Sequence, residues 1–225
     1  MAKKTQVIAT HDPGYRAQQE YTPAFLRIYD GLVLGVFCRV LWRSPAPEVV
    51  SDYERHVSRR HLEVGPGTGY FLDKARIPDD IELTLADPNP AVLEYAARRL
   101  ARYTPTTVQL DVRKPLPFRG PYDSVAMNGV LHCLPGPIER KASAVQSVAA
   151  VLADGGVLFG STIVVDAPTH TRLSRALIRA NNRRGIFGNE SDTVPAIRSL
   201  FEAEFQDVDV QLRGTMAVFT ARAPR

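Results

Sequence analysis

The sequence is poor in cysteine and has no apolar run long enough to cross a membrane. Its 225 residues include two cysteines, Cys38 and Cys133. Two thiols are too few for a disulfide framework or a metal cluster, so we expect a reducing, cytoplasmic environment and no bound metal. The longest apolar run, 31–42, is shorter than the roughly 20 residues that a spanning helix needs, and it contains Arg39. We expect it to form a buried or interface helix.

Signals for export and for repeats are also missing. The basic residues Lys3 and Lys4 are not followed by the apolar segment of a secretory signal. No internal repeat or low-complexity tract interrupts the chain, and 44% of its residues are hydrophobic. This length and composition predict a single domain, 1–225, in which about 60 residues precede the first core strand.

The excess of positive charge is small. The 28 Lys and Arg residues exceed the 24 Asp and Glu residues by a formal net charge of +4. A helix is predicted over 168–184, and its expected buried face consists of Leu173, Ala176, Leu177 and Ala180. Its opposite face carries an arginine stripe: Arg172, Arg175, Arg179 and Arg183. Because no aromatic residues alternate with these arginines, we interpret the stripe as a solvated face and expect no nucleic-acid partner.

A glycine-rich loop is the most informative feature that is present. The apolar strand predicted at 61–64 leads into Gly65-Pro66-Gly67-Thr68-Gly69 and then into a helix. Glycines tolerate positive φ and let a ligand approach the backbone amides that begin a helix. The dinucleotide fingerprint would need a glycine where this chain has Tyr70. Glu63, just before the loop, suits a cationic amine better than a pyrophosphate.

Polar residues follow the ends of the next predicted strands. Asp87 ends the strand 81–87 and precedes a helix predicted from Pro90 through Arg102. At that edge of an open α/β sheet, a carboxylate can accept both hydroxyls of a ribose; the alternative is a helix cap. Asp111 lies in the strand predicted at 107–112.

The remaining pattern continues the alternation of strands and helices. A strand beginning at Tyr122 reaches Asn128 and His132, a helix follows over about 138–152, and Gly155-Gly156 suits its C-cap before an apolar strand over 157–163. A helix over 193–204 and a hairpin of strands 207–212 and 216–221 complete the chain.

These ordered segments, over about 60–164, resemble the class I S-adenosylmethionine-dependent methyltransferases. The glycine motif is met by Glu63 to Gly69, the ribose acid by Asp87, and the adenine-contacting acid by Asp111 with Val112. The segment after the fourth strand is met by Asn128 to His132, and the Leu-x-x-Gly-Gly turn by Leu152 to Gly156. Ala153-Asp154 departs from the usual Lys-Pro of that turn.

The resemblance implies the fold and the site. The fold is an α/β three-layer sandwich with a seven-stranded, mostly parallel sheet, whose last strand runs antiparallel between strands five and six. Residues 1–59 would form a helical lid and 60–225 the cofactor-binding core. The cofactor is S-adenosyl-L-methionine, with S-adenosyl-L-homocysteine as product, and the expected cofactor-binding residues are Glu63, Gly65, Pro66, Gly67, Asp87, Pro88, Asp111, Val112, Asn128, Tyr21 and Tyr29.

Methyl transfer requires in-line positioning, exclusion of water and, for some acceptors, removal of a proton. His132 is the predicted proton acceptor, because an unperturbed imidazole titrates near neutrality; His11, Asp166 and His170 are alternatives. We expect a small-molecule acceptor, with an oxygen, nitrogen, sulfur or carbon nucleophile. An RNA or protein methyltransferase and a cofactor-binding protein without methyl transfer remain alternatives, and either a monomer or a homodimer is compatible with the sequence.

Overall fold

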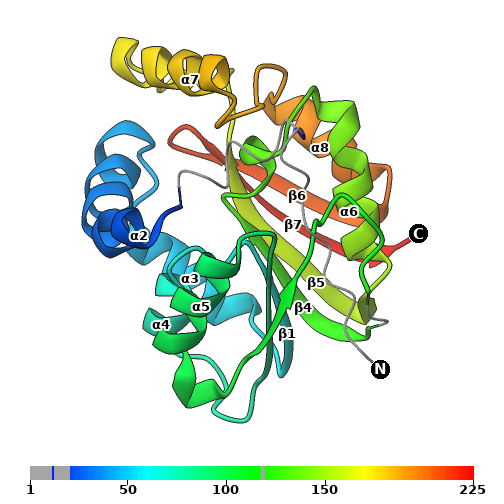
Figure 1. The fold of residues 1–225 in the computed structure, drawn as a ribbon. Helices are drawn as coiled ribbons and strands as arrows, with labels where there is room; N and C mark the ends of the chain where they lie inside the picture. Colours follow the sequence, from blue (N-terminus) through cyan, green and yellow to red (C-terminus); the bar gives the residue numbers. More distant parts are fainter. Residues whose placement is uncertain (1–11, 13–20, 118–119) are drawn as a thin grey trace.

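The computed structural model describes residue 12 and residues 21–117 and 120–225, and it contains the expected sheet (Figure 1). Its seven strands lie in the order β3-β2-β1-β4-β5-β7-β6. Their bounds are Arg60–Val64 (β1), Glu82–Asp87 (β2), Thr106–Gln109 (β3), Tyr122–Asn128 (β4), Leu152–Ile163 (β5), Phe205–Arg213 (β6) and Met216–Pro224 (β7). β1 to β5 pair in parallel, and β7 pairs antiparallel with both β5 and β6. The predicted strand order is confirmed.

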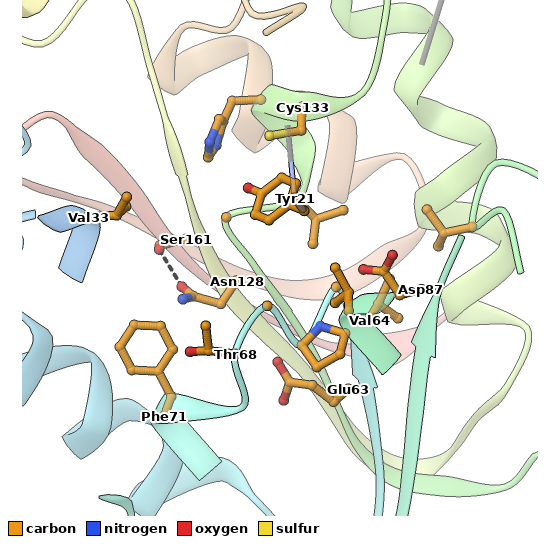
Figure 2. Close-up of a pocket in the computed structure, with 18 of the residues that line it drawn as sticks. Tyr21, Val33, Glu63, Val64, Thr68, Phe71, Asp87, Asn128, Cys133 and Ser161 are labelled. Atoms are coloured by element: carbon orange, nitrogen blue, oxygen red, sulfur yellow. Dashed lines mark hydrogen bonds between the residues drawn. The ribbon is translucent and has the colours of Figure 1, made fainter. Parts of the chain in front are cut away.

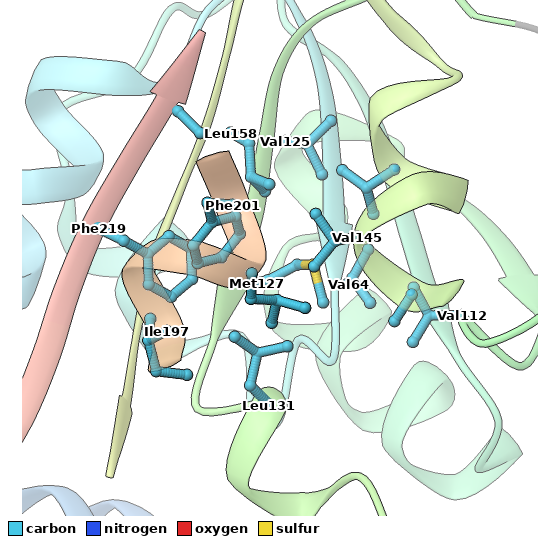
Figure 3. Packing of buried hydrophobic residues seen from close by; sticks show 14 of the residues in the cluster. Val64, Val112, Val125, Met127, Leu131, Val145, Leu158, Ile197, Phe201 and Phe219 are labelled. Atoms are coloured by element: carbon cyan, nitrogen blue, oxygen red, sulfur yellow. The ribbon is translucent and has the colours of Figure 1, made fainter. Parts of the chain in front are cut away.

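Helices cover both faces of this sheet, which confirms the three layers. Helices α3 (Ala46–His56), α4 (Tyr70–Lys74) and α5 (Pro90–Arg99) cover one face, and α6 (Ala142–Ala149) and α8 (Val194–Glu202) cover the other (Figure 1). The first face is packed around Tyr53, Leu85 and Phe159. On the second face, Figure 3 shows Val145, Ile197 and Phe201 from the helices against the side chains of the central strands.

Two helices precede α3 and lie next to the carboxyl ends of the strands. Pro23–Tyr29 (α2) is α-helical, and Asp30–Leu41 (η1) continues it with π-helical bonding. Trp42 N, for example, donates to the Phe37 carbonyl five residues earlier at 2.9 Å. Three short 3-10 helices are η2 (Ala101–Tyr103), η3 (Leu131–Cys133) and η4 (Ile138–Lys141), and a longer α-helix is α7 (Arg172–Arg184).

The helix over 31–42, expected to be buried or to form an interface, is buried on one side only. Leu34 and Leu41 are buried, whereas Val36 and Val40 are 49% and 60% exposed. The covered side packs against Ile163, Met216 and Ile178 of α7. Over the described residues, no helix is long and apolar enough to pass through a bilayer.

The predicted buried face of α7 is also wrong. Ser174 and Ile178 are the buried residues of this helix, and Leu173 is 65% exposed. The reason lies at its first turn, where Thr171 and Ser174 form a capping box and His170 Nδ1 lies 3.1 Å from Ser174 Oγ. These bonds turn Ser174 inward, so the buried face is shifted by one residue. The four arginines of the stripe are exposed, as expected.

The chain around the glycine pair is a strand rather than a helix end. Helix α6 ends at Ala149 with Ala150 as its C-cap, and β5 begins at Leu152. The pairing of β4 with β5 shifts its register between Tyr122 and Ser124, next to these glycines. A Cβ at Gly156 would lie 2.9 Å from the Ala153 carbonyl oxygen, so a larger residue would not fit this irregular stretch. Other boundaries differ less: β3 ends at Gln109, so Asp111 lies in the loop beyond it.

Candidate cofactor and acceptor site

One cavity of about 220 Å³ lies at the carboxyl ends of the parallel strands and contains every predicted site residue in its lining. These are Tyr21, Tyr29, Glu63, Gly65, Pro66, Gly67, Asp87, Pro88, Asp111, Val112, Asn128 and His132. Figure 2 shows Asp87 at one end and Val33 of η1 at the other, with Asn128 between them. The structure therefore brings together residues from five separate segments of the sequence.

The glycine loop has the conformation that its composition predicts. Gly65, Gly67 and Gly69 have φ angles of 69°, 54° and 75°, in the region that other residues rarely adopt. A Cβ at Gly65 would lie 2.7 Å from Val130 Cγ2, so only glycine lets the loop pass beneath the segment after β4. At Gly67 a Cβ would meet nothing within 4 Å. The loop backbone is therefore open to the cavity.

Glu63 is held by a buried hydrogen-bond network. The Tyr53 hydroxyl donates to Glu63 Oε1 at 2.6 Å, and His61 Nε2 lies 3.1 Å from Oε2. His61 Nδ1 is 2.8 Å from Ser124 Oγ, which accepts from the Ser58 amide at 2.8 Å. Ser124 is therefore free to donate to Nδ1, which places the imidazole proton on Nε2, toward Glu63. Two donors, Tyr53 and His61, thus orient the Glu63 carboxylate.

Asp87 lies at the end of β2, as expected. The amide of Asn89 donates to its Oδ1 at 2.7 Å, and among the described residues no cation is paired with this carboxylate. Burial raises the pKa of Asp87 to about 7, and the Asn89 amide opposes this rise. A ligand that donates hydrogen bonds to Asp87 would therefore favour its ionised form.

Asp111 is paired with an arginine that the sequence reasoning missed. Arg113 donates from Nε to Asp111 Oδ1 at 2.9 Å and from Nη2 to Oδ2 at 2.8 Å, and it also reaches Asp12 Oδ2 at 3.0 Å. Burial would lower the pKa of Arg113, but its bonds to the two carboxylates outweigh burial and raise it. Arg113 thus links residue 12 to the loop after β3. The only sequence signal was its position two residues after Asp111.

Asn128 is oriented by Ser161, a second residue that the sequence reasoning missed. Ser161 Oγ donates to Asn128 Oδ1 at 2.5 Å across the β4–β5 pair, as the dashed line in Figure 2 marks. Because this oxygen accepts, the amide NH₂ of Asn128 remains as a donor toward the cavity. Ser161 lies near the end of a predicted apolar strand, where a lone hydroxyl was the available signal.

The helices before α3 are tied to the glycine loop and to the loop after β2. Thr68 Oγ1 donates to Asp30 Oδ1 at 2.5 Å, and Arg99 donates to Asp30 Oδ2 at 2.6 Å. Asn89 Nδ2 donates to the Tyr21 carbonyl at 3.3 Å. The rings of Tyr21 and Tyr29 lie side by side over the cavity, with centroids 5.8 Å apart. Their predicted position above the cofactor loop is therefore compatible with the structure.

The end of the cavity farthest from Asp87 has apolar walls. η1 and the residues after it contribute Val33, Leu34, Cys38 and Trp42, and β5 and β7 contribute Ile163 and Met216. Burial raises the pKa of the Cys38 thiol to about 11, so it remains protonated at neutral pH. We call this region, bounded by Val33, Trp42, Ile163 and Met216, the acceptor end.

His132 lies in η3 between the two ends and is 7% exposed. Its Nδ1 is 3.3 Å from Thr162 Oγ1, and its ring packs edge-on against Phe187. Burial, with a smaller contribution from Lys141, lowers the pKa of His132 to about 3. The imidazole is therefore neutral at physiological pH and a weak base, so its predicted role as proton acceptor stays a prediction.

The alternative proton acceptors lie elsewhere. Asp166 accepts from the Val194 amide at 3.1 Å, and His170 Nε2 lies 2.7 Å from the Val164 carbonyl. Neither lines the cavity. His11 and Tyr15 lie outside the described residues.

The cavity matches the chemistry of S-adenosylmethionine. Among the described lining residues, the carboxylates are Glu63, Asp87 and Asp111, one at the end of each of three neighbouring strands. They can accept from an ammonium, a ribose and an adenine amino group, and the open glycine loop offers backbone amides to a carboxylate. A zwitterionic adenosine compound therefore fits the residues that are present.

Comparisons with known proteins agree with this geometry. A family model described as a methyltransferase domain matches residues 62–158. The demethylluteothin O-methyltransferase of Streptomyces thioluteus is 36% identical over 206 residues, which cover 91% of this chain and 90% of the relative. The physcion biosynthesis cluster O-methyltransferase of Aspergillus chevalieri is 34% identical over 216 residues, covering 95% and 97%.

A solved structure supports the same fold. The N-methyltransferase NodS of Bradyrhizobium japonicum WM9, in complex with S-adenosyl-L-homocysteine, has a TM-score of 0.64 at 15% identity and covers 95% of this chain and 100% of its own. The expected methyltransferase activity and S-adenosylmethionine cofactor are thereby confirmed. The chain belongs to the class I S-adenosylmethionine-dependent methyltransferases.

Proposed function

We propose that this small-molecule methyltransferase transfers its methyl group to a hydroxyl oxygen of a neutral, apolar acceptor, such as a phenol or an enol. The observation that carries the proposal is the distribution of charge in the cavity. All carboxylates among the described lining residues lie at the ends of β1 and β2 or just beyond β3, whereas the acceptor end is bounded by Val33, Trp42, Ile163 and Met216. An acceptor with a charged amine would find no anionic partner there.

The residue roles that we propose follow the geometry of the cavity. Glu63 binds the ammonium group, Asp87 the ribose hydroxyls, and Asp111 the adenine amino group. Pro88 and Val112 contact the adenine, the backbone from Gly65 through Gly67 faces the methionine carboxylate, and Asn128 lies near the reacting group. Tyr21 and Tyr29 form the roof, as part of a lid that we assign to residues 1–59.

The chemistry needs little from the protein beyond position and desolvation. The bound cofactor supplies a methyl group already activated by its sulfonium. The apolar acceptor end excludes water, and the neutral donors near its border, Asn128 Nδ2 and His132, suit an oxygen that carries negative charge. The acceptor hydroxyl releases its proton to bulk solvent on binding, its oxygen then bonds to the methyl carbon, and the electrons of the broken carbon–sulfur bond remain on sulfur.

The relatives support an oxygen acceptor. Both curated relatives described above are named O-methyltransferases. The RNA alternative lacks support, because none of the four arginines of the α7 stripe lines the cavity. We also propose a cytoplasmic location, which the free thiols of Cys38 and Cys133 support.

The test compares a hydroxyl acceptor with an amine acceptor of similar shape, and includes RNA as a third substrate. Purified protein is supplied with S-adenosylmethionine and with naphthol, with naphthylmethylamine, which is an ammonium ion at neutral pH, or with total RNA, and formation of S-adenosylhomocysteine is measured. We expect turnover with the hydroxyl compound and less than about one tenth of it with the amine, because the acceptor end stabilises no ammonium. Faster turnover with the amine or with RNA contradicts the proposal. Binding of S-adenosylhomocysteine is the control for an active preparation.

A further inference from the structure

The imidazole of His132 has one ring nitrogen, Nδ1, close to β5, and the other, Nε2, available to a ligand in the cavity. Nδ1 is 3.3 Å from Thr162 Oγ1 and 3.4 Å from the Ile163 amide nitrogen. Among the described residues, Nε2 has no hydrogen-bond partner. Three buried side-chain atoms of the described residues lack a hydrogen-bond partner: Ser44 Oγ, His56 Nδ1 and Asp192 Oδ1. Nε2 of His132 is not among them, so it is not completely enclosed by protein. Since His132 lines the cavity, Nε2 is its polar contact with that space.

The sheet determines which nitrogen carries the proton. The last residue pair between β4 and β5 is Asn128 with Ser161. Just beyond it, the Gly129 amide donates to the Ser161 carbonyl. Strand β4 has ended by the level of Ile163, so the Ile163 amide has no strand carbonyl on the side of β5 that faces β4 and is directed at His132 Nδ1. A backbone amide can only donate, and a buried amide is costly to leave unbonded. Nδ1 must therefore be the unprotonated acceptor, and the proton lies on Nε2.

We propose that His132 serves the acceptor as a hydrogen-bond donor, through Nε2–H, and not as the base that removes its proton. The acceptor hydroxyl releases its proton to bulk solvent on binding, and its oxygen then bonds to the methyl carbon while the carbon–sulfur electron pair stays on sulfur. His132 keeps its proton throughout and holds the oxygen in line by donating to it. This role rests on the proposed oxygen acceptor.

The surroundings of the ring favour a neutral donor. The edge of His132 packs against Phe187 with ring centroids 4.8 Å apart, and the Gly188 amide donates to the His132 carbonyl at 2.9 Å. The cation that acts on this imidazole is Lys141, which is fully buried with its partner Asp192 at 2.5 Å. A second positive charge on the imidazole would be repelled by Lys141 and poorly solvated, consistent with the lowered pKa.

The first experiment is independent of any acceptor. Nitrogen-15 NMR of the full chain, free and with S-adenosylhomocysteine, reports the tautomer of each of the five histidines, and His132→Gln assigns the signals of His132 by their loss. We expect a pyrrole-type Nε2 and a pyridine-type Nδ1, unchanged between about pH 5 and 8. A protonated Nδ1, an even mixture of tautomers, or titration within that range overturns the proposal whether or not an O-methyl product is ever found.

The second experiment separates a donor from a base in turnover. The side-chain amide of His132→Gln can donate from a position near that of Nε2 but cannot act as a base, and His132→Phe can do neither. With the hydroxyl acceptor, we expect His132→Gln to keep kcat within about tenfold of the parent and His132→Phe to lose about a hundredfold, for one charge-assisted bond. Equal losses in both variants, with S-adenosylhomocysteine binding intact, contradict the donor role. Cofactor binding and the circular dichroism of each variant control for folding.

Discussion

The cofactor end of the cavity, around the ends of β1, β2 and β3, contains carboxylates that other side chains or a backbone amide hold in place. In the acceptor end, around η1, β5 and β7, the walls are apolar and the border groups are neutral donors. Tyr53 and His61 fix Glu63 in the first region, whereas Ser161 fixes Asn128 at the border of the second. We infer from this difference that the cavity selects its cofactor by charge and its acceptor by shape and neutral hydrogen bonds.

The two ends also differ in how the chain builds them. The cofactor end comes mainly from one stretch, 63–113, that crosses three neighbouring strands. The acceptor end joins η1, η3, the end of β5 and Met216 of β7, which lie far apart in the sequence. Substitutions in the cofactor end should therefore change cofactor affinity. Substitutions of the buried residues next to the acceptor end should change the free energy of unfolding.

The largest effect is expected behind the acceptor end. Lys141 and Asp192 form an ion pair in which neither side chain is exposed. Lys141→Met leaves a buried carboxylate without its cation, so we expect the free energy of unfolding to fall by about 3–5 kcal/mol, measured by urea denaturation. The double variant Lys141→Met/Asp192→Leu should recover much of this loss. If both variants are as stable as the parent, the ion pair does not contribute to the free energy of unfolding.

The next effect concerns cofactor affinity. Asp87→Ala removes the acceptor that we propose for both ribose hydroxyls, and calorimetry should show S-adenosylhomocysteine binding weakened by about 2–3 kcal/mol. The matched control is Glu82→Ala, an exposed carboxylate on the same strand, which should change affinity by less than about 0.5 kcal/mol. Equal losses in the two variants would mean that overall charge, and not the position of Asp87, determines binding.

The pH dependence of binding follows from the same residue. The pKa of Asp87 is raised to about 7 in the free protein, and hydroxyl donors favour its ionised form, so binding below pH 7 must release a proton. Affinity for S-adenosylhomocysteine should therefore be constant above about pH 8 and fall by up to tenfold per unit below 7. Calorimetry in two buffers of different ionisation enthalpy measures the released proton. Asp87→Asn should remove this dependence, and a dependence that persists in it must come from another group.

The smallest effect is expected where residue 12 meets the cofactor end. Asp12→Ala removes one partner of Arg113, whose bidentate pairing with Asp111 remains. A partly exposed ion pair contributes about 1 kcal/mol or less, so cofactor affinity should weaken less than fivefold, with faster dissociation in stopped-flow measurements. Arg113→Ala should weaken it more, because Asp111 then loses its orientation as well. The reverse order would mean that Asp12 contacts the cofactor directly.

Sequence reasoning predicted most of the fold and nearly all of the cofactor end. Glycines with positive φ, and carboxylates at strand ends, depend on local geometry that the residue types themselves determine, as at Gly65 and Asp87. The antiparallel insertion of β7 came from the family resemblance, because strand periodicity carries no information on which edges pair. The glycine pair at 155–156 was misassigned because a glycine required by a bulge looks the same in sequence as one required by a C-cap.

What escaped prediction depended on long-range contacts. Ser161 orients Asn128 only because β5 lies beside β4, and Met216 reaches the acceptor end only through the last hairpin. Leu173 was placed inside α7 by its spacing, yet the capping box at Thr171 set the helix rotation and left Leu173 in solvent. Periodicity gives the apolar stripe of a helix, but the contacts at its first turn decide which stripe faces the protein.

The position of β7 has a consequence for the synthesis of the chain. Residues 216–224 bond on both sides, to β5 and to β6, although they are made after every other strand. Until they emerge from the ribosome, the nascent chain presents the edge of β5, whose residues from Val157 to Ile163 are buried in the finished protein. Such an apolar, unpaired edge is prone to pair with other chains. Loss of these last residues, by premature termination or proteolysis, would therefore open the middle of the sheet rather than shorten a tail.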